Sequence, residues 1–340
     1  MNLRRFNAVF IARNLEFYRD RSALAWNILF PVLLVFGFAF AFSNKSMDVY
    51  KVGLMGESAT IAKPHFLEAK YIQFIPVSDQ ETALHKVARH QLDMLLNTDT
   101  RQYWINPESP KGYVLERMFH GTELLARNKD TAYKKGEISG KQVRYIDWLV
   151  PGILGMNIMF SALFGIGYVI VRYRKNGVLK RLSATPLTAL EFLSAQIASR
   201  LALITVITMG VYAGVDFFLD FSMAGSYGTL FLLFLLGTAS MVAMGLIVAA
   251  RVSNEELAGG ILNMISWPMM FLSGVWFSLE NLDPVVKQLA QVFPLTHMID
   301  GVRAVMIDGK TLPQLIPEIA TLSIMTLVFL LIGAVAFRWK

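Results

Sequence analysis

The fold follows from RYRKNGVLKRLSATPLTALE, residues 172–191, a short basic segment between two long apolar runs. Both runs are long enough to cross a membrane, so the segment is a brief turn at one membrane face. Five cations lie within it, and short cationic loops stay on the cytoplasmic side of a membrane. The segment therefore predicts a multi-pass membrane protein and fixes its orientation.

The same segment is predicted to be ordered. Residues Gly177–Leu182 can form one or two helical turns, which end before Pro186 because the residue before a proline avoids helical geometry. Thr188 and Glu191 have the spacing of a capping box that starts the next helix. A rigid basic loop of this kind, here taken as 172–191, is suited to docking onto a partner.

Composition indicates the same class of protein. The chain is 54% hydrophobic and 17% charged, and it contains no cysteine. A helix needs about 20 apolar residues to cross the hydrocarbon core. Five uncharged runs approach that length, and a sixth contains only Arg200, whose side chain can snorkel to the inner interface. The six predicted spans are residues 22–42, 148–171, 192–215, 221–250, 257–279 and 319–337.

Charge predicts the topology. With both termini inside, the short cytoplasmic segments hold 14 Lys and Arg against five acids, whereas the short outer loops hold three against seven. Residues 43–147 are left out, because long loops translocate largely regardless of charge. We expect a bacterial inner-membrane protein with cytoplasmic termini, and the net charge of +7 then requires no nucleic-acid partner.

The two parts outside the main spans have different patterns. Residues 1–21 are amphipathic and predict a helix in the inner interface, with simple anchoring as the alternative role. Residues 43–147 have the composition of a small extracytoplasmic α/β domain. Its expected strands are 49–54, 71–77, 92–96 and 102–105, and its expected helices are 80–90 and 113–126.

Residues 280–307 are too polar to cross a membrane but contain two short amphipathic pieces separated by Pro294. We interpret them as re-entrant helices that close the outer end of the bundle, because irregular backbone at that depth must be buried in protein. The alternative is an amphipathic hairpin that rests on the outer leaflet.

The residues indicate no catalytic, cofactor-binding or metal site. His85 and His90 are five apart, off a common helical face, and the chain offers no thiolate. Asp308–Thr311 ends like a phosphate-binding loop, but Ala304 stands where the leading glycine is required. Nucleotide binding by this chain is therefore not predicted.

The order of interfacial helix, first span, external domain and five further spans resembles the permease subunits of ATP-binding-cassette exporters, type 2 class. The most specific matches are GVLKRLSATPLTALEFL at 177–193 and FPLTHMIDGVRAVMIDG at 293–309. The resemblance covers essentially the whole chain. It implies a homodimer, or a heterodimer with a paralogue, above two cytoplasmic ATPase subunits that bind ATP and magnesium.

In that family the inner loop is similar to a coupling helix that docks on the ATPase. The resemblance assigns this role to Gly177, Lys180, Arg181, Leu182, Thr185 and Pro186. One departure concerns the glutamate often found ahead of the glycine, where this chain has Arg174, Lys175 and Asn176. A contact of the partner with an acid at that place is therefore in doubt.

Polar side chains deep in spans are costly and need an explanation. Asn157 in the second span and Asn263, Ser266 and Met270 in the fifth are candidates to line a substrate path, with interhelical hydrogen bonding or packing as the alternative. The resulting hypothesis is ATP-driven export of an amphiphilic drug or lipid, with handover to a periplasmic adaptor. The alternative is a membrane-anchored sensor or assembly factor whose external domain binds a ligand; a membrane enzyme fits the residues least.

Overall fold

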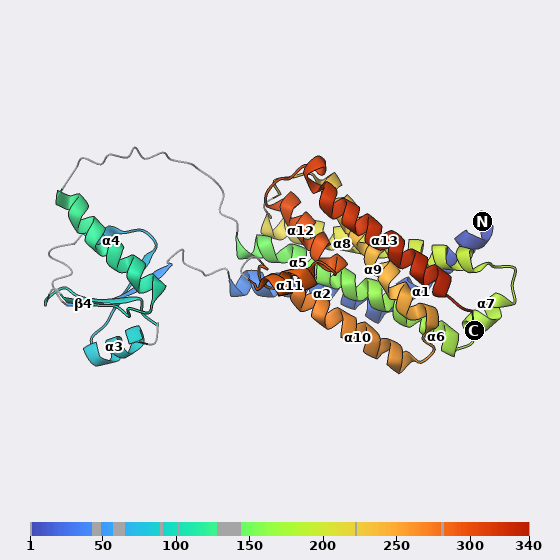
Figure 1. Cartoon of the computed structure of the whole chain (residues 1–340), viewed down its shortest axis with the longest axis horizontal. Coiled ribbons are helices and arrows are strands. Elements are labelled where there is room, and N and C mark those ends of the chain that lie inside the picture. The colour runs from blue at the N-terminus through green and yellow to red at the C-terminus, as the bar shows by residue number, and fades with distance from the viewer. Residues whose placement is uncertain are drawn as a thin grey trace. The chain divides into compact units, whose positions relative to one another are not determined.

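The computed structural model describes residues 2–42, 49–56, 65–88, 91–100, 102–127, 144–221, 223–279 and 282–339. The chain divides into two compact units, one formed by Met1–Phe42 with Lys141–Lys340 and the other by Ser43–Gly140. The first unit is a bundle of helices, and the second contains a small sheet with helices (Figure 1). His90 lies outside the described residues.

Five helices of the described residues are long and apolar enough to cross a membrane. The second of them is one 31-residue element, interrupted by the π-helical turn η3 (Phe164–Tyr168). The prediction of a multi-span helical protein is thereby confirmed. The five are α2 (Arg21–Ala41), α5 (Tyr145–Leu163) continuing through η3 into α6 (Val169–Lys175), α8 (Ala189–Leu219), α9 (Tyr227–Arg251), and η4 (Leu312–Leu315) with α13 (Ile316–Ala336).

Two predicted spans are wrong at one end. The run 257–279 contains α10 (Glu255–Leu272), which stops at Ser273 because Gly274 turns the chain with a φ of 70°. The run 221–250 becomes helical only at Tyr227, where the Ser226 side chain caps α9. Absence of charge therefore overstates helix length wherever a cap or a left-handed residue intervenes.

The core of the helical unit is built around α5. Its side chains are buried along almost the whole helix, including Leu149, Ile153 and Leu163. α5 contacts α8, α9 and α12 (Pro294–Met306), whereas α2 and α13 leave most of their apolar side chains exposed. An apolar exposed surface of this kind suits a lipid environment.

Two further helices complete the bundle. α1 (Leu3–Arg19) begins at Asn2, whose side chain caps it, and runs along α8. α11 (Pro284–Ala290) precedes α12 and is the more exposed of the two short helices expected within 280–307. In the view of Figure 1 the C-terminal end of this unit lies beside α7 (Val178–Ser183).

The second unit has a four-stranded sheet in the order β2-β1-β3-β4. β1 is parallel to both β2 and β3, and β3 is antiparallel to β4. α4 (Pro110–Arg127) packs through Leu115 on one face, and α3 (Gln80–Ala88) packs through Ala83 and Val87 on the other. The strands are β1 (Tyr50–Met55), β2 (Ile72–Pro76), β3 (Met94–Asn97) and β4 (Gln102–Trp104), and a short 3-10 helix, η2, spans His65–Glu68.

Candidate functional site: the basic loop and its supports

The basic loop is a short helix with defined ends. α6 stops at Asn176, and Gly177 takes a left-handed φ of 69° that lets the chain turn into α7. The Thr185 hydroxyl donates to the carbonyl oxygen of Leu182 at 2.6 Å, which closes the last turn before Pro186. The helical turns expected at Gly177–Leu182 are confirmed by α7. They could be predicted because residues within the loop itself specify them.

The expected capping box at the start of α8 is also confirmed. The amide nitrogen of Glu191 donates to the Thr188 hydroxyl at 3.2 Å, and the amide of Thr188 donates to the Glu191 carboxylate at 3.1 Å. Both ends of the loop are therefore fixed by hydrogen bonds within the loop itself.

α7 has an inner face and an outer face. Leu179 is fully buried, and Leu182 is half-buried against the helical core. Lys180, Arg181, Thr185 and Pro186 are exposed, and we call these four the coupling surface. The outward side of the loop is therefore basic and polar, and Leu182 serves partly to hold α7 onto its own bundle.

The first half of α1 fastens this loop from the side. The amide nitrogen of Asn2 donates to the Glu191 carboxylate at 2.7 Å, and Arg5 donates to the carbonyl oxygen of Pro186 at 2.5 Å. Further along, the Ser199 hydroxyl donates to the Asn14 side chain at 3.0 Å. α1, the loop and the start of α8 thus form one connected piece.

Glu16 ties the second half of α1 to α6. Its carboxylate accepts hydrogen bonds from Arg13 at 2.7 Å, from Arg172 at 3.2 Å and from the Tyr173 hydroxyl. Burial on its own raises the pKa of Glu16, but the hydrogen bond from Tyr173 and the two arginines bring that pKa below its ordinary value. The carboxylate is therefore ionised at neutral pH and accepts three hydrogen bonds.

Arg174 and Lys175 both bind to other segments of this chain. Arg174 donates to the carbonyl oxygens of Ala249 and Arg338, each at 2.9 Å, and Lys175 pairs with Glu255 at 3.0 Å. They connect α6 to the ends of α9, α10 and the C-terminal segment. The sequence placed these cations in the loop but gave no sign that their partners lie within the same chain.

Arg200 does not behave as predicted. Its residue is 8% exposed, and its guanidinium lies 5.2 Å from the centre of the Phe17 ring on α1. The expectation that it snorkels freely to the interface is wrong, because α1 covers it. Sequence reasoning missed this contact, since it joins residues from two helices far apart in the chain.

Three of the four path candidates are engaged inside the helical unit. The Asn157 amide donates to the carbonyl oxygen of Asn27 at 3.1 Å, and the buried Ser266 hydroxyl donates to Leu262 of its own helix at 2.6 Å. Met270 is buried. Asn263 differs, because its side chain is exposed and bonds only to Gly259 of its own helix, at 2.9 Å.

At the opposite end of the bundle, Arg303 of α12 joins three segments. Its side chain donates to the carbonyl oxygens of Trp148 at 3.1 Å and Gly274 at 2.8 Å, and it lies 3.5 Å from the centre of the Trp148 ring. α12 is largely buried against α5 and α9. This contact fixes the turn after α10 against the start of α5.

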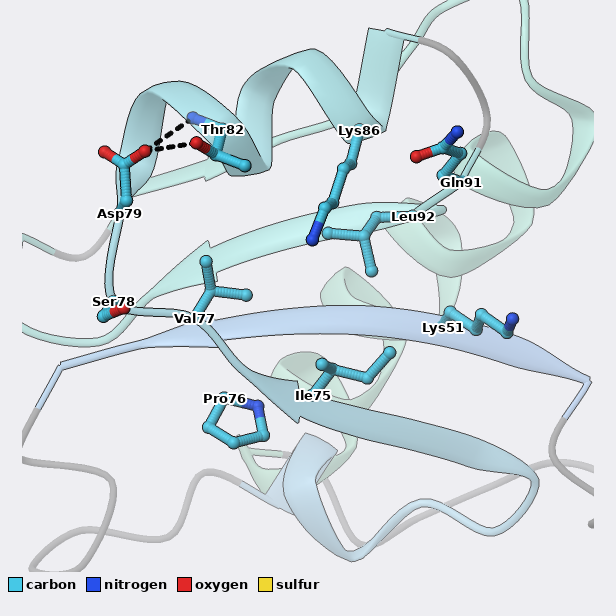
Figure 2. Close-up of a pocket in the computed structure, with 10 residues that line it drawn as sticks. All are labelled: Lys51, Ile75, Pro76, Val77, Ser78, Asp79, Thr82, Lys86, Gln91 and Leu92. Atoms are coloured by element: carbon cyan, nitrogen blue, oxygen red, sulfur yellow. Dashed lines mark hydrogen bonds between the residues drawn. The ribbon is translucent and has the colours of Figure 1, made fainter.

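The second unit has an open groove of about 430 Å³ between α3 and the sheet (Figure 2). Lys86 reaches from α3 toward the sheet, and Lys51 lies on β1 at the other side. Asp79 caps α3 by accepting from the Thr82 amide at 3.1 Å, and the bonds from Thr82 lower the pKa of this carboxyl. The groove is a candidate ligand site of the second unit.

Comparison with known proteins gives a consistent set of relatives. Residues 21–335 match the family described as "ABC-2 family transporter protein". The chain is 20% identical to the probable multidrug ABC transporter permease YbhS of Escherichia coli (strain K12), over 99% of the chain and 95% of that protein.

Two other relatives match over shorter regions. The probable multidrug ABC transporter permease YbhR of the same strain is 21% identical, over 48% of the chain, and the chain covers 45% of that protein. Nodulation protein J of Rhizobium leguminosarum bv. viciae is 24% identical, over 60% of the chain and 77% of that protein. Because the family match extends over nearly the whole chain, this protein belongs to the ABC-2 transporter family and is an ABC transporter permease.

Proposed function

We propose that this permease exports an amphiphilic drug or lipid, with ATP hydrolysis supplied by a separate cytoplasmic subunit that binds ATP and magnesium. The observation that carries the proposal is the exposed coupling surface on a loop held rigidly by α1 and α6. A rigid loop transmits displacement, whereas a flexible loop absorbs it. Cations at 180 and 181 offer the ATPase subunit a basic contact.

The proposed assembly contains a second permease copy, either identical or a paralogue. The exposed face of α10 supports it: Asn263 lies there beside Met264 and Trp267, which are 78% and 52% exposed. An amide facing hydrocarbon is costly, so a protein surface is the better neighbour for this face. Asn263 would then face the space between the copies, and Asn157, Ser266 and Met270 would support the helices around it.

The proposed topology has six crossings, with both termini in the cytoplasm of a bacterial cell and the inner membrane around the bundle. α10 supplies the sixth crossing: its 18 residues span about 27 Å, close to the hydrocarbon thickness of about 30 Å. α11 and α12 would then form the re-entrant cap at the outer end. Residues 43–140 would lie outside the cytoplasm and pass cargo to a periplasmic adaptor.

Single cysteines test this topology, because the chain has none of its own. Ser183 lies beside the coupling surface and Asp308 follows α12, and both are exposed. We expect an impermeant thiol reagent applied to intact cells to label a cysteine at 308 and to leave one at 183 unlabelled until the cells are opened. Labelling at 183 in intact cells would contradict the proposed orientation.

Transport itself is tested by reconstitution of the permease with its ATPase into vesicles. We expect ATP-dependent movement of an amphiphilic dye or fluorescent lipid, abolished when the catalytic base of the ATPase is removed. The cargo preference is suggested by the two relatives named as probable multidrug permeases. If no member of a broad cargo panel moves while the external domain binds a small ligand tightly, the sensor alternative replaces export.

A further inference from the structure

Three arginines and one carboxylate lie close together where α1 packs against α6 and α8. We call Arg13, Arg172, Arg200 and Glu16 the arginine cluster. Glu16 accepts from Arg13 and Arg172 but not from Arg200. Within the described part of the chain, no acceptor takes a hydrogen bond from Arg200, and its Nε is buried without a partner.

The position of Arg200 is imposed by its neighbours. One side of the guanidinium faces the Phe17 ring at 5.2 Å, and another lies against the backbone of Gly165 in η3. A Cβ built on Gly165 would lie 1.8 Å from the Arg200 Nε, so only glycine leaves room for this side chain. The carbonyl oxygen of Gly165 is already used by Arg13, at 3.2 Å. The fold therefore holds a guanidinium in place and gives it no acceptor.

The charge of the cluster is unbalanced, because three cations face a single carboxylate, which already accepts hydrogen bonds from Arg13, Arg172 and Tyr173. A buried cation without a hydrogen-bonded partner is unfavourable, so an anion from outside the chain is the expected partner. Guanidinium groups bind phosphate oxygens in a planar fork, which suits them to this anion in particular.

The location indicates which phosphate is available. The cluster lies under α1, whose exposed residues include the apolar Ile11 and Leu15. A helix of this kind lies among lipid headgroups, and anionic lipids gather in the cytoplasmic leaflet near basic residues. Arg172 is 42% exposed at the edge of the cluster, so a headgroup can approach from that side.

We propose that Arg200, together with Arg13 and Arg172, binds the phosphate group of an anionic phospholipid in the leaflet that surrounds α1. The site anchors α1 over η3, and α1 in turn holds the basic loop in place. The proposal rests on the proposed membrane orientation and is independent of whether the protein exports a cargo.

The test is native mass spectrometry of the purified full-length permease after delipidation. The probes are phosphatidylglycerol, phosphatidylcholine with the same acyl chains, and inorganic phosphate. We expect the wild type to retain phosphatidylglycerol in preference to phosphatidylcholine. Arg200→Gln should weaken this binding about tenfold, which is the loss of one charge-assisted contact. The affinity of Arg200→Lys for phosphatidylglycerol should lie between those of the wild type and Arg200→Gln, because lysine keeps the charge but lacks the planar guanidinium.

The matched control is Arg19→Gln, because Arg19 is an exposed arginine on α1, the helix that covers Arg200, and lies outside the cluster. It should bind like the wild type. If Arg200→Gln does not fold, Arg172→Gln replaces it with the same expected direction. Equal retention of both lipids by the wild type, or unchanged binding in the cluster variants, overturns the proposal.

A third result would also overturn it: inorganic phosphate that displaces phosphatidylglycerol completely would make this a small-anion site instead of a lipid site. The measurement uses neither the ATPase nor a cargo. Failure here therefore leaves the proposed export function untouched, and failure of export leaves this result standing.

Discussion

Changing Lys180 and Arg181 together to glutamate is expected to detach the ATPase subunit from this permease. Both side chains are exposed on α7, and neither donates a hydrogen bond to another described residue, so the permease itself should fold normally. Reversal of charge at a docking surface replaces attraction with repulsion, and such juxtapositions cost several kcal/mol. Because about 1.4 kcal/mol corresponds to a tenfold change in affinity, we expect at least a tenfold loss.

The measurement is the ratio of ATPase to permease after affinity purification, together with the rate of ATP hydrolysis in vesicles. Lys310→Glu is the matched control, because Lys310 is equally exposed but follows α12 at the other end of the bundle. Leu182→Asp is a poorer probe, since Leu182 packs partly against the core and its loss would also loosen α7. Normal stoichiometry and normal hydrolysis in the double variant would disprove the role of the coupling surface.

Replacing Gly152 with alanine is expected to destabilise the helical unit strongly. A Cβ at this position would lie 2.5 Å from the carbonyl oxygen and 3.0 Å from the Cα of Val275. These are backbone atoms in the turn after α10, and they cannot move aside as a flexible side chain can. Overpacking of this kind costs about 1–3 kcal/mol, and Gly152→Val should cost more because it adds two further methyl groups.

Gly210→Ala on α8 is the control, because nothing lies within 4 Å of a Cβ built there. It should be neutral or slightly stabilising, since alanine favours a helix more than glycine does. The measurement is the thermal unfolding midpoint of each purified protein in the same detergent. Equal midpoints for Gly152→Ala and the wild type would show that the turn adapts and that close packing is not required there.

The effect of Gly152→Ala should extend to α12. The turn that it contacts also supplies Gly274, whose carbonyl oxygen accepts from Arg303 at 2.8 Å. Displacement of the turn therefore removes a hydrogen bond from the half-buried Arg303 guanidinium, which fixes α12. Arg303 and Gly152 both contact the turn after α10. The effects of their variants on the unfolding midpoint are therefore not expected to be additive.

Local chemistry made much of this molecule predictable. The length of an apolar run identifies a membrane helix, and five of the expected spans coincide with helices long enough to cross. Gly177, the Thr188–Glu191 capping box and the turn before Pro186 specify the conformation of the basic loop through contacts between residues close together in the chain. The strands and helices of residues 43–140 likewise lie close to their expected positions, because alternation and turn residues are local signals.

Contacts between distant helices were not predictable in this way. Arg174, Lys175, Arg200 and Arg303 were all counted as topology signals, yet each is placed by a backbone carbonyl, a carboxylate or a ring in another part of the chain. No local pattern distinguishes an arginine that faces solvent from one that lies against a neighbouring helix. Asn157 of α5 likewise finds its acceptor on α2, at the carbonyl oxygen of Asn27, and no pattern near Asn157 in the chain indicates this partner.

The amino-acid sequence therefore specified which segments form long apolar helices and where the loop turns, because helix length and capping depend on neighbours in the chain. Tertiary packing specified what each cation and each buried amide contacts, because those partners lie far away in the chain, as for Asn157 and Asn27, which are 130 residues apart. By contrast, the start of α9 and the end of α10 are set locally, because the Ser226 cap and the left-handed Gly274 interrupt the apolar runs. Partner choice is a property of helix arrangement, and the arrangement is set by close packing at positions such as Gly152 and Gly165.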